Sequence, residues 1–178
     1  MKNFKLNEKD ILSNQDWTFP TTTYYGPGRL NEIGKFCEEF DIKNPLIVTD
    51  SGSKDLPFIK KLIALLSKNN IKSDLFYNIS PNPRDDEISK GCDQFKNGSH
   101  DSIIAIGGGS AMDGGKSICL TVNSETPLWD FEFEQPVPKI TKENAFPKII
   151  TIPTTAGTGA ETEITAMVTH LEKGMKFC

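Results

Sequence analysis

Three short apolar runs, separated by segments with helical periodicity, constrain the fold of this chain more than any other feature. The runs are Pro45–Asp50, Ser102–Ile106 and Lys148–Ile152. Continuous apolar runs of this length are typical of strands buried on both faces of a parallel sheet. Parallel strands need crossover connections, which helices usually supply. The sequence therefore predicts an α/β domain with a Rossmann-like, doubly wound, mainly parallel sheet.

The segments around these runs complete the predicted order of elements. Residues 1–16 are polar and weakly patterned and are interpreted as an N-terminal arm, which leaves 17–178 as the domain. Asp55 is a plausible N-cap for the second helix. Helical patterns cover roughly 30–40, 57–70, 85–97 and 110–122. Further strands are expected over 17–25 and 72–77, an irregular excursion over 123–144, and an added β-hairpin after the last run.

Composition narrows the class of protein. The 178 residues carry a formal net charge of −4, which argues against a strongly basic nucleic-acid binder. Two histidines, His100 and His170, are too few for a multi-histidine metal site in one chain. The four cysteines form no C-x-x-C pair and are interpreted as reduced, mostly buried residues. With no leader or bilayer-spanning run, a cytoplasmic location without membrane attachment is expected.

A glycine-rich turn follows the second apolar run. Gly107-Gly108-Gly109-Ser110 ends a predicted strand and opens a predicted helix, where unpaired backbone N–H groups and the helix dipole favour a phosphate. A tight turn without a ligand is the alternative. The G-x-G-x-x-G fingerprint fails because Met112 takes its last position, and a near-P-loop that ends at Lys116-Ser117 lacks its first glycine.

The helix after this turn carries two further signals. Asp113 and Lys116 have i,i+3 spacing, and the simplest interpretation is a solvated ion pair. Gly114 and Gly115 are costly inside a helix, so either a ligand or a facing strand is expected to pack closely there.

A second loop, rich in threonine and glycine, follows the third apolar run. Its short hydroxyl groups, over 153–162, suit hydrogen bonds to polar ligand atoms. Thr158 and Glu161 also have the spacing of a helix capping box, so a helix start is the alternative interpretation.

Together the two loops resemble those of iron-containing (group III) alcohol dehydrogenases. Ile106–Lys116 is similar to the family's glycine-rich cofactor loop and Ile152–Glu161 to its threonine-rich loop, with Ala160 where serine is common. Two further segments, Ser80–Pro83 and Phe19–Gly28, also fit the family's pattern in order and spacing. The resemblance covers nearly the whole chain. It implies a dinucleotide-binding α/β domain followed by a helical metal domain. The implied chemistry is hydride transfer between an alcohol and NAD(P), with Fe²⁺ or Zn²⁺ polarising the substrate oxygen.

The resemblance implies which residues meet the cofactor. Those expected at the pyrophosphate are Gly108, Gly109 and Ser110. Those expected on the adenine and ribose side are Asn82, Thr154, Thr155 and Thr158. Asp113 would lie near the nicotinamide half, and Lys176 would hydrogen-bond a ribose.

Asp50 ends the first apolar run, where members of that family bind the adenosine ribose. A carboxylate there accepts hydrogen bonds from a 2′-hydroxyl and repels a 2′-phosphate, so NAD is expected over NADP. The alternative is an aspartate that merely starts a loop.

The resemblance also implies one aspartate and three histidines as metal ligands, all beyond residue 178. His100 and His170 match no ligand position and are interpreted as surface residues, so no catalytic or metal residue is assigned. A truncated NAD-dependent dehydrogenase is expected, weakly active on a small alcohol or aldehyde unless a metal domain is supplied. The alternatives are a non-enzymatic nucleotide-binding module and one half of a split enzyme. A strand edge near 17–25 would allow a homodimer.

Overall fold

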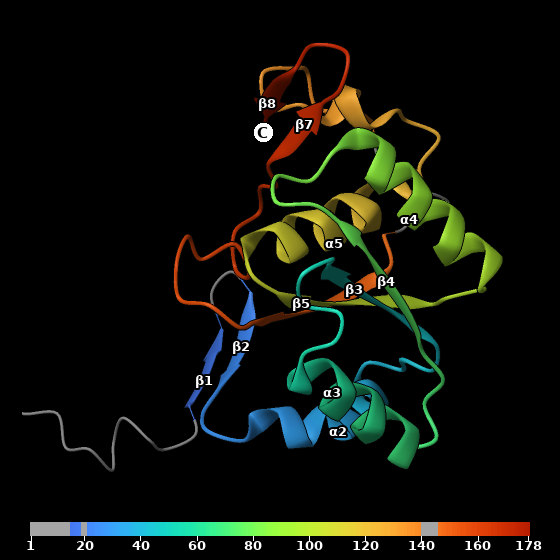
Figure 1. The fold of residues 1–178 in the computed structure, drawn as a ribbon, viewed down its shortest axis with the longest axis vertical. Helices are drawn as coiled ribbons and strands as arrows, with labels where there is room; N and C mark the ends of the chain where they lie inside the picture. Colours follow the sequence, from blue (N-terminus) through green and yellow to red (C-terminus); the bar gives the residue numbers. More distant parts are fainter. Residues whose placement is uncertain (1–14, 19–20, 140–145) are drawn as a thin grey trace, which may run out of the picture.

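The computed structural model describes residues 15–18, 21–139 and 146–178, and its centre is a sheet with helices on both faces (Figure 1). The parallel strands are β3 (Pro45–Asp50), β4 (Asp74–Ile79), β5 (Ser102–Gly107) and β6 (Lys148–Pro153). Their order is β4-β3-β5-β6. The chain steps from β3 outward to β4 and then back across β3 to β5, so the carboxyl ends of β3 and β5 flank a topological switch point. The predicted doubly wound α/β fold is confirmed.

Helices cover the two faces of this sheet (Figure 1). One face carries η1 (Arg29–Glu32), α2 (Ile33–Glu39) and α3 (Pro57–Lys68), and the other carries α4 (Asp85–Asn97) and α5 (Gly109–Thr121). Side chains along the central strands alternate between the two cores. Ile47 and Ile104 pack into the core on the α2–α3 side, whereas Leu46 and Ile103 pack into the core on the α4–α5 side. Both faces are buried, which is why these strands are apolar at successive positions.

Helix α5 approaches the sheet through its paired glycines. A Cβ added at Gly115 would lie 2.5 Å from the Ala105 Cβ of β5, and one added at Gly114 would lie 2.8 Å from Cδ1 of Ile79. Real Cβ atoms do not come this close to neighbours, so the helix sits where a side chain would hold it off. The close packing expected at these glycines is confirmed, and the facing strands account for it.

The outer elements are small antiparallel pairs. The single strand expected over 17–25 is wrong, because β1 (Gln15–Thr18) and β2 (Thr22–Tyr25) form two paired strands. The excursion after α5 contains a short 3-10 helix, η2 (Leu128–Phe131), and its residues 140–145 lie outside the described residues, as do residues 1–14 of the expected arm. The expected hairpin is present as β7 (Val168–His170) and β8 (Met175–Phe177).

Three local predictions are wrong. Asp55 does not cap α3, because Leu56 is the N-cap and no side chain bonds the helix start. His100 is not a surface residue: its ring is fully buried, and Nδ1 lies 3.0 Å from the Asn44 carbonyl oxygen. His170 is not one either, since its ring stacks on Trp129 with 4.6 Å between centroids and leaves 12% of the side chain exposed. Both rings are buried by contacts distant in the sequence, which residue type alone does not reveal.

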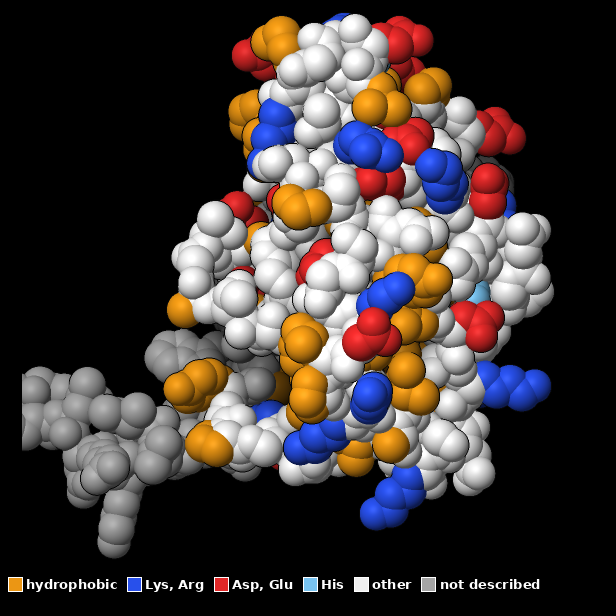
Figure 2. All heavy atoms as spheres, viewed as in Figure 1, with side chains coloured by type: hydrophobic (Ala, Val, Ile, Leu, Met, Phe, Trp, Pro, Cys, Tyr) orange, Lys and Arg blue, Asp and Glu red, His pale blue; other side chains and the backbone are white. Residues whose placement is uncertain are grey.

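The surface mixes charged and apolar side chains. In the view of Figure 2, hydrophobic side chains lie among Lys, Arg, Asp and Glu side chains over much of this face. Two of the four thiols, those of Cys37 and Cys119, are buried, and all four cysteines are unpaired. None of the helices that the structure describes has the length and hydropathy that a bilayer crossing requires.

Candidate functional site

The candidate site lies at the switch point, where β5 turns into α5. Gly107 ends β5 with φ +147°, a backbone conformation that favours glycine. A Cβ added there would lie 2.7 Å from the Ala111 Cβ and 3.1 Å from Oδ2 of Asp50. The turn therefore requires glycine, and it lies beside the carboxylate that ends β3.

The start of α5 faces the threonine-rich loop. Gly108 is the N-cap, Gly109 is the first helical residue, and no side chain caps the helix. A Cβ at Gly108 would lie 3.5 Å from Oγ1 of Thr155, and one at Gly109 would lie 3.7 Å from Oγ1 of Thr158. The hydroxyl groups of Thr155 and Thr158 therefore lie close to the start of α5, whose first N–H groups no side chain caps. A phosphate group suits both, because the N–H groups and hydroxyls donate to it and the helix dipole favours its charge.

Two alternative interpretations of these loops are wrong. A P-loop places its Gly-Lys-Ser at the start of a helix, but Lys116 and Ser117 lie well inside α5, and Ser117 is buried. A capping box at Thr158 and Glu161 would open a helix, but no helix occurs in the described segment 154–178. The segment instead turns back through a hydrogen bond from the Thr162 N–H to the Gly159 carbonyl, with N and O 2.9 Å apart.

Asn82 joins two other parts of the site. It lies in the loop between β4 and α4, and its backbone N–H donates to Oγ of Ser110 with N and O 3.3 Å apart. The Lys176 ammonium, from β8, donates to Oδ1 of Asn82 over 2.9 Å. Asn82, Ser110 and Lys176 are far apart in the sequence, and the fold places them side by side. Their contact with a cofactor stays a prediction.

Asp113 and Lys116 are not a solvated pair. Their charged groups lie 3.7 Å apart, and only 15% and 16% of the two side chains is exposed. Burial raises the pKa of Asp113 and lowers the pKa of Lys116, and the attraction between the two opposes both shifts. The Lys116 ammonium also donates to the backbone carbonyls of Glu163 and Thr165. Lys116 thereby fastens α5 to the segment after the threonine-rich loop, a role that sequence spacing did not indicate.

The Asp50 carboxylate has local partners. Oδ1 accepts from the backbone N–H of Gly52 over 3.0 Å, and Oδ2 accepts from Oγ of Ser53 over 2.7 Å. These contacts are those of a loop-starting aspartate, the alternative considered above. Because each carboxylate oxygen accepts more than one hydrogen bond, a ribose role remains compatible with them. On the far side of the turn, the Thr154 N–H donates to the Gly107 carbonyl over 2.9 Å and holds the threonine-rich loop against it.

The threonine-rich loop carries alanine at its base. Ala160 is buried with Ala105, Ala111 and Met112 in a small apolar cluster between β5 and α5. A serine hydroxyl at this depth would need a hydrogen-bond partner. The apolar surroundings therefore account for alanine at a position where serine is common in the resembling family.

Metal ligands do not gather in this part of the molecule. Across residues 15–18, 21–139 and 146–178, no group of three or more His, Cys, Asp or Glu side chains is placed to hold a metal ion. Nδ1 of His100 faces a backbone carbonyl, and the ring of His170 faces Trp129. The described residues thus offer a phosphate group N–H and hydroxyl donors at the switch point, and they do not fit a resident metal.

Comparisons with known proteins agree with this geometry. The family model for iron-containing alcohol dehydrogenase matches residues 20–178. The choline dehydrogenase of Bacillus subtilis is 32% identical over 174 residues, which are 97% of this chain and 43% of that protein. A crystal structure of 1,3-propanediol oxidoreductase superposes with a TM-score of 0.78 at 30% identity, covering 85% of this chain and 38% of the other.

A third similar protein was solved with a cofactor. The sulfoacetaldehyde reductase of Bifidobacterium kashiwanohense, in complex with NAD⁺, superposes with a TM-score of 0.74 at 27% identity. The match covers 85% of this chain and 39% of the reductase. The chain therefore spans about two fifths of the length of the relatives it matches.

Proposed function

Because this chain belongs to the iron-containing alcohol dehydrogenase family, we propose that it binds NAD(H) for hydride transfer between an alcohol and an aldehyde or ketone. One observation carries the proposal. The uncapped start of α5 faces the threonine-rich loop at the switch point of the sheet, where open α/β sheets bind their ligands.

Each group at this site has a part in holding the dinucleotide. The N–H groups of Gly109 and Ser110 donate to the pyrophosphate, and the absence of side chains at Gly108 and Gly109 lets it approach the main chain. Thr155 and Thr158 donate hydroxyl groups from the opposite side. When bound, the nicotinamide ring gives or takes the hydride.

The remaining predicted residues orient the two ends of the cofactor. Asp50 accepts from a ribose hydroxyl on one side of the glycine turn. Lys176, held by Asn82, donates to the other ribose. Asp113, largely buried beside Lys116, lies toward the nicotinamide end. Together these residues bind the two ends of the cofactor and orient its nicotinamide ring.

The alcohol must also be activated, and in this family a metal supplies that chemistry. The described residues do not fit such a metal. We propose that the 178 residues by themselves bind NAD(H) and turn over alcohols weakly. A cytoplasmic location and a homodimer stay predictions.

The carboxylate of Asp50 predicts a preference for NADH. Calorimetric titration of the unaltered chain is expected to give an NADH affinity at least about tenfold higher than its NADPH affinity, since like charges repel the 2′-phosphate. Asp50→Gly should narrow this gap about tenfold, mainly by weakening NADH.

A matched variant separates charge from hydrogen bonding. Asp50→Asn keeps an oxygen that accepts from the Gly52 N–H and removes the charge, so it should strengthen NADPH binding more than it weakens NADH binding. An unaltered chain that binds NADPH as tightly as NADH would refute the role given to Asp50.

A further inference from the structure

The loop over 80–84 presents Asn82 to the proposed cofactor site in a left-handed backbone conformation. Asn82 has φ +68°, a conformation that residues other than glycine adopt uncommonly, although asparagine adopts it more readily than most. It is followed by Pro83, and a residue before proline is restricted further. Contacts from outside the loop hold its two ends in place.

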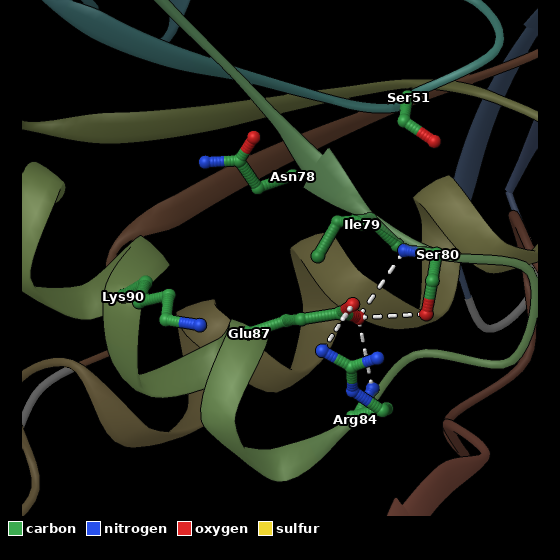
Figure 3. A pocket seen from close by; sticks show the side chains of 7 residues that line it. All are labelled: Ser51, Asn78, Ile79, Ser80, Arg84, Glu87 and Lys90. Carbon is green, nitrogen blue, oxygen red and sulfur yellow. Dashed lines mark hydrogen bonds and ion pairs between the residues drawn. The ribbon is translucent and has the colours of Figure 1, made fainter.

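Glu87 supplies those contacts from the first turn of α4. Its Oε2 accepts from the backbone N–H of Ser80 over 3.2 Å, from Oγ of Ser80 over 3.1 Å, and from the backbone N–H of Arg84 over 3.1 Å. Its Oε1 lies 3.3 Å from Nη2 of Arg84. One carboxylate thus holds both ends of the loop, and Figure 3 shows Ser80 and Arg84 converging on it.

The burial of Glu87 makes this arrangement costly to disrupt. The residue is 4% exposed, on the wall of a shallow cavity of about 290 Å³ that Asn78 and Lys90 also line. A buried carboxylate is tolerated when hydrogen-bond donors satisfy it, and here the loop supplies them. The hydrogen bond from the Arg84 N–H to Oε2 of Glu87 joins the N-cap residue of α4 to the third residue of the helix. It is one half of a capping box, because the arginine side chain has no acceptor for the reciprocal bond, and the sequence pattern did not indicate it.

We propose that Glu87 is a positioning residue for the cofactor site. It fastens the loop over 80–84 so that Asn82 stays against Ser110 of α5 and Lys176 of β8, and it does so without contacting the dinucleotide. The inference rests on the proposed function, because the affinity that Glu87 controls is the affinity for NAD(H).

A double-mutant cycle tests this role. NADH affinity is measured by calorimetry for the unaltered chain, Glu87→Ala, Asn82→Ala and the double variant, with urea unfolding of each. We expect each single variant to weaken NADH binding about tenfold, and the double variant to bind no more weakly than either single variant, because both changes disturb one hydrogen bond, from the Lys176 ammonium to Oδ1 of Asn82. If Glu87 had only a structural role, Glu87→Ala would lower the free energy of unfolding, but its effect on NADH affinity would not depend on whether Asn82 is present.

Two variants serve as controls. Glu87→Gln keeps an oxygen that accepts from the Ser80 and Arg84 N–H groups and should bind NADH within about threefold of the unaltered chain. Asp86→Asn alters the neighbouring carboxylate, which pairs with the Arg84 and Lys90 side chains, and should leave NADH affinity unchanged. If Glu87→Ala does not fold, Glu87→Asp replaces it in the cycle, since its shorter side chain cannot reach both ends of the loop.

The outcomes distinguish the two claims. NADH binding by Glu87→Ala within twofold of the unaltered chain, or a double variant weakened about a hundredfold, overturns the role of Glu87 alone. If the unaltered chain binds no NADH, the proposed function falls, and this inference falls with it.

Discussion

Replacing Gly109 with aspartate is expected to weaken NADH binding at least a hundredfold without destabilising the fold. Gly109 opens α5, and the space beside it toward Thr158 is where the pyrophosphate is proposed to lie. An aspartate there places a negative charge against the pyrophosphate, a repulsion of several kcal/mol, which corresponds to about a hundredfold or more in affinity. The same charge stabilises the start of a helix by about 0.3–1 kcal/mol. Calorimetric titration with NADH and urea unfolding measure the two effects separately.

Gly109→Asn is the matched control, since asparagine has nearly the same size as aspartate and no charge. The Gly109→Asn variant should bind NADH at least about tenfold more tightly than Gly109→Asp does, because only steric obstruction remains. If both variants bind NADH as tightly as the unaltered chain, the pyrophosphate does not lie at the start of α5.

Replacing Gly115 with valine is expected to lower the free energy of unfolding by about 3 kcal/mol or more. The first added carbon would lie 2.5 Å from the Ala105 Cβ. Ala105 belongs to the central strand β5 and is fully buried, so its Cβ cannot move aside. Overpacking of a dense core costs about 1–3 kcal/mol, occasionally more, and the branched side chain adds two further carbons. Urea unfolding followed by far-ultraviolet circular dichroism measures the loss.

Two variants show that the loss comes from the contact with β5. Gly115→Ala gains about 1 kcal/mol of helix propensity and should still be less stable than the unaltered chain. Gly157→Ala adds the same methyl group where no atom lies within 4 Å, and its free energy of unfolding should change by less than about 0.5 kcal/mol. A Gly115→Val protein as stable as the unaltered chain would mean that α5 does not pack against β5 as described.

The sheet and most of its helices could be predicted from the sequence, because burial on both faces leaves an apolar signature in each central strand. The helix over 85–97 was predicted with the bounds that the structure has. The pairing of β1 with β2 was less visible, because both strands fall within one stretch rich in β-forming residues. Pro20, which stands between them in the sequence, is the local signal that argues against a continuous strand.

The glycine turn was predictable from the sequence because the carboxyl ends of parallel strands gather at one edge of a sheet. Asp50, Asn82 and Lys176 were expected only from the family resemblance, and most contacts between distant segments left no local signal. The contacts of Lys116 with the Glu163 and Thr165 carbonyls join segments nearly fifty residues apart, and no spacing rule indicates them. The burial of His100 against Asn44 has the same origin.

An amide chemical-shift map of the chain titrated with NADH tests the central claim most directly. Nuclear magnetic resonance reports each backbone N–H separately, so it locates the ligand as well as detecting it. We expect the largest shifts at Gly108, Gly109 and Ser110, smaller ones at Thr155 and Thr158, and none along α3 on the opposite face of the sheet. Shifts gathered on the α2–α3 face, or no shifts at millimolar NADH, would contradict a dinucleotide site at the switch point.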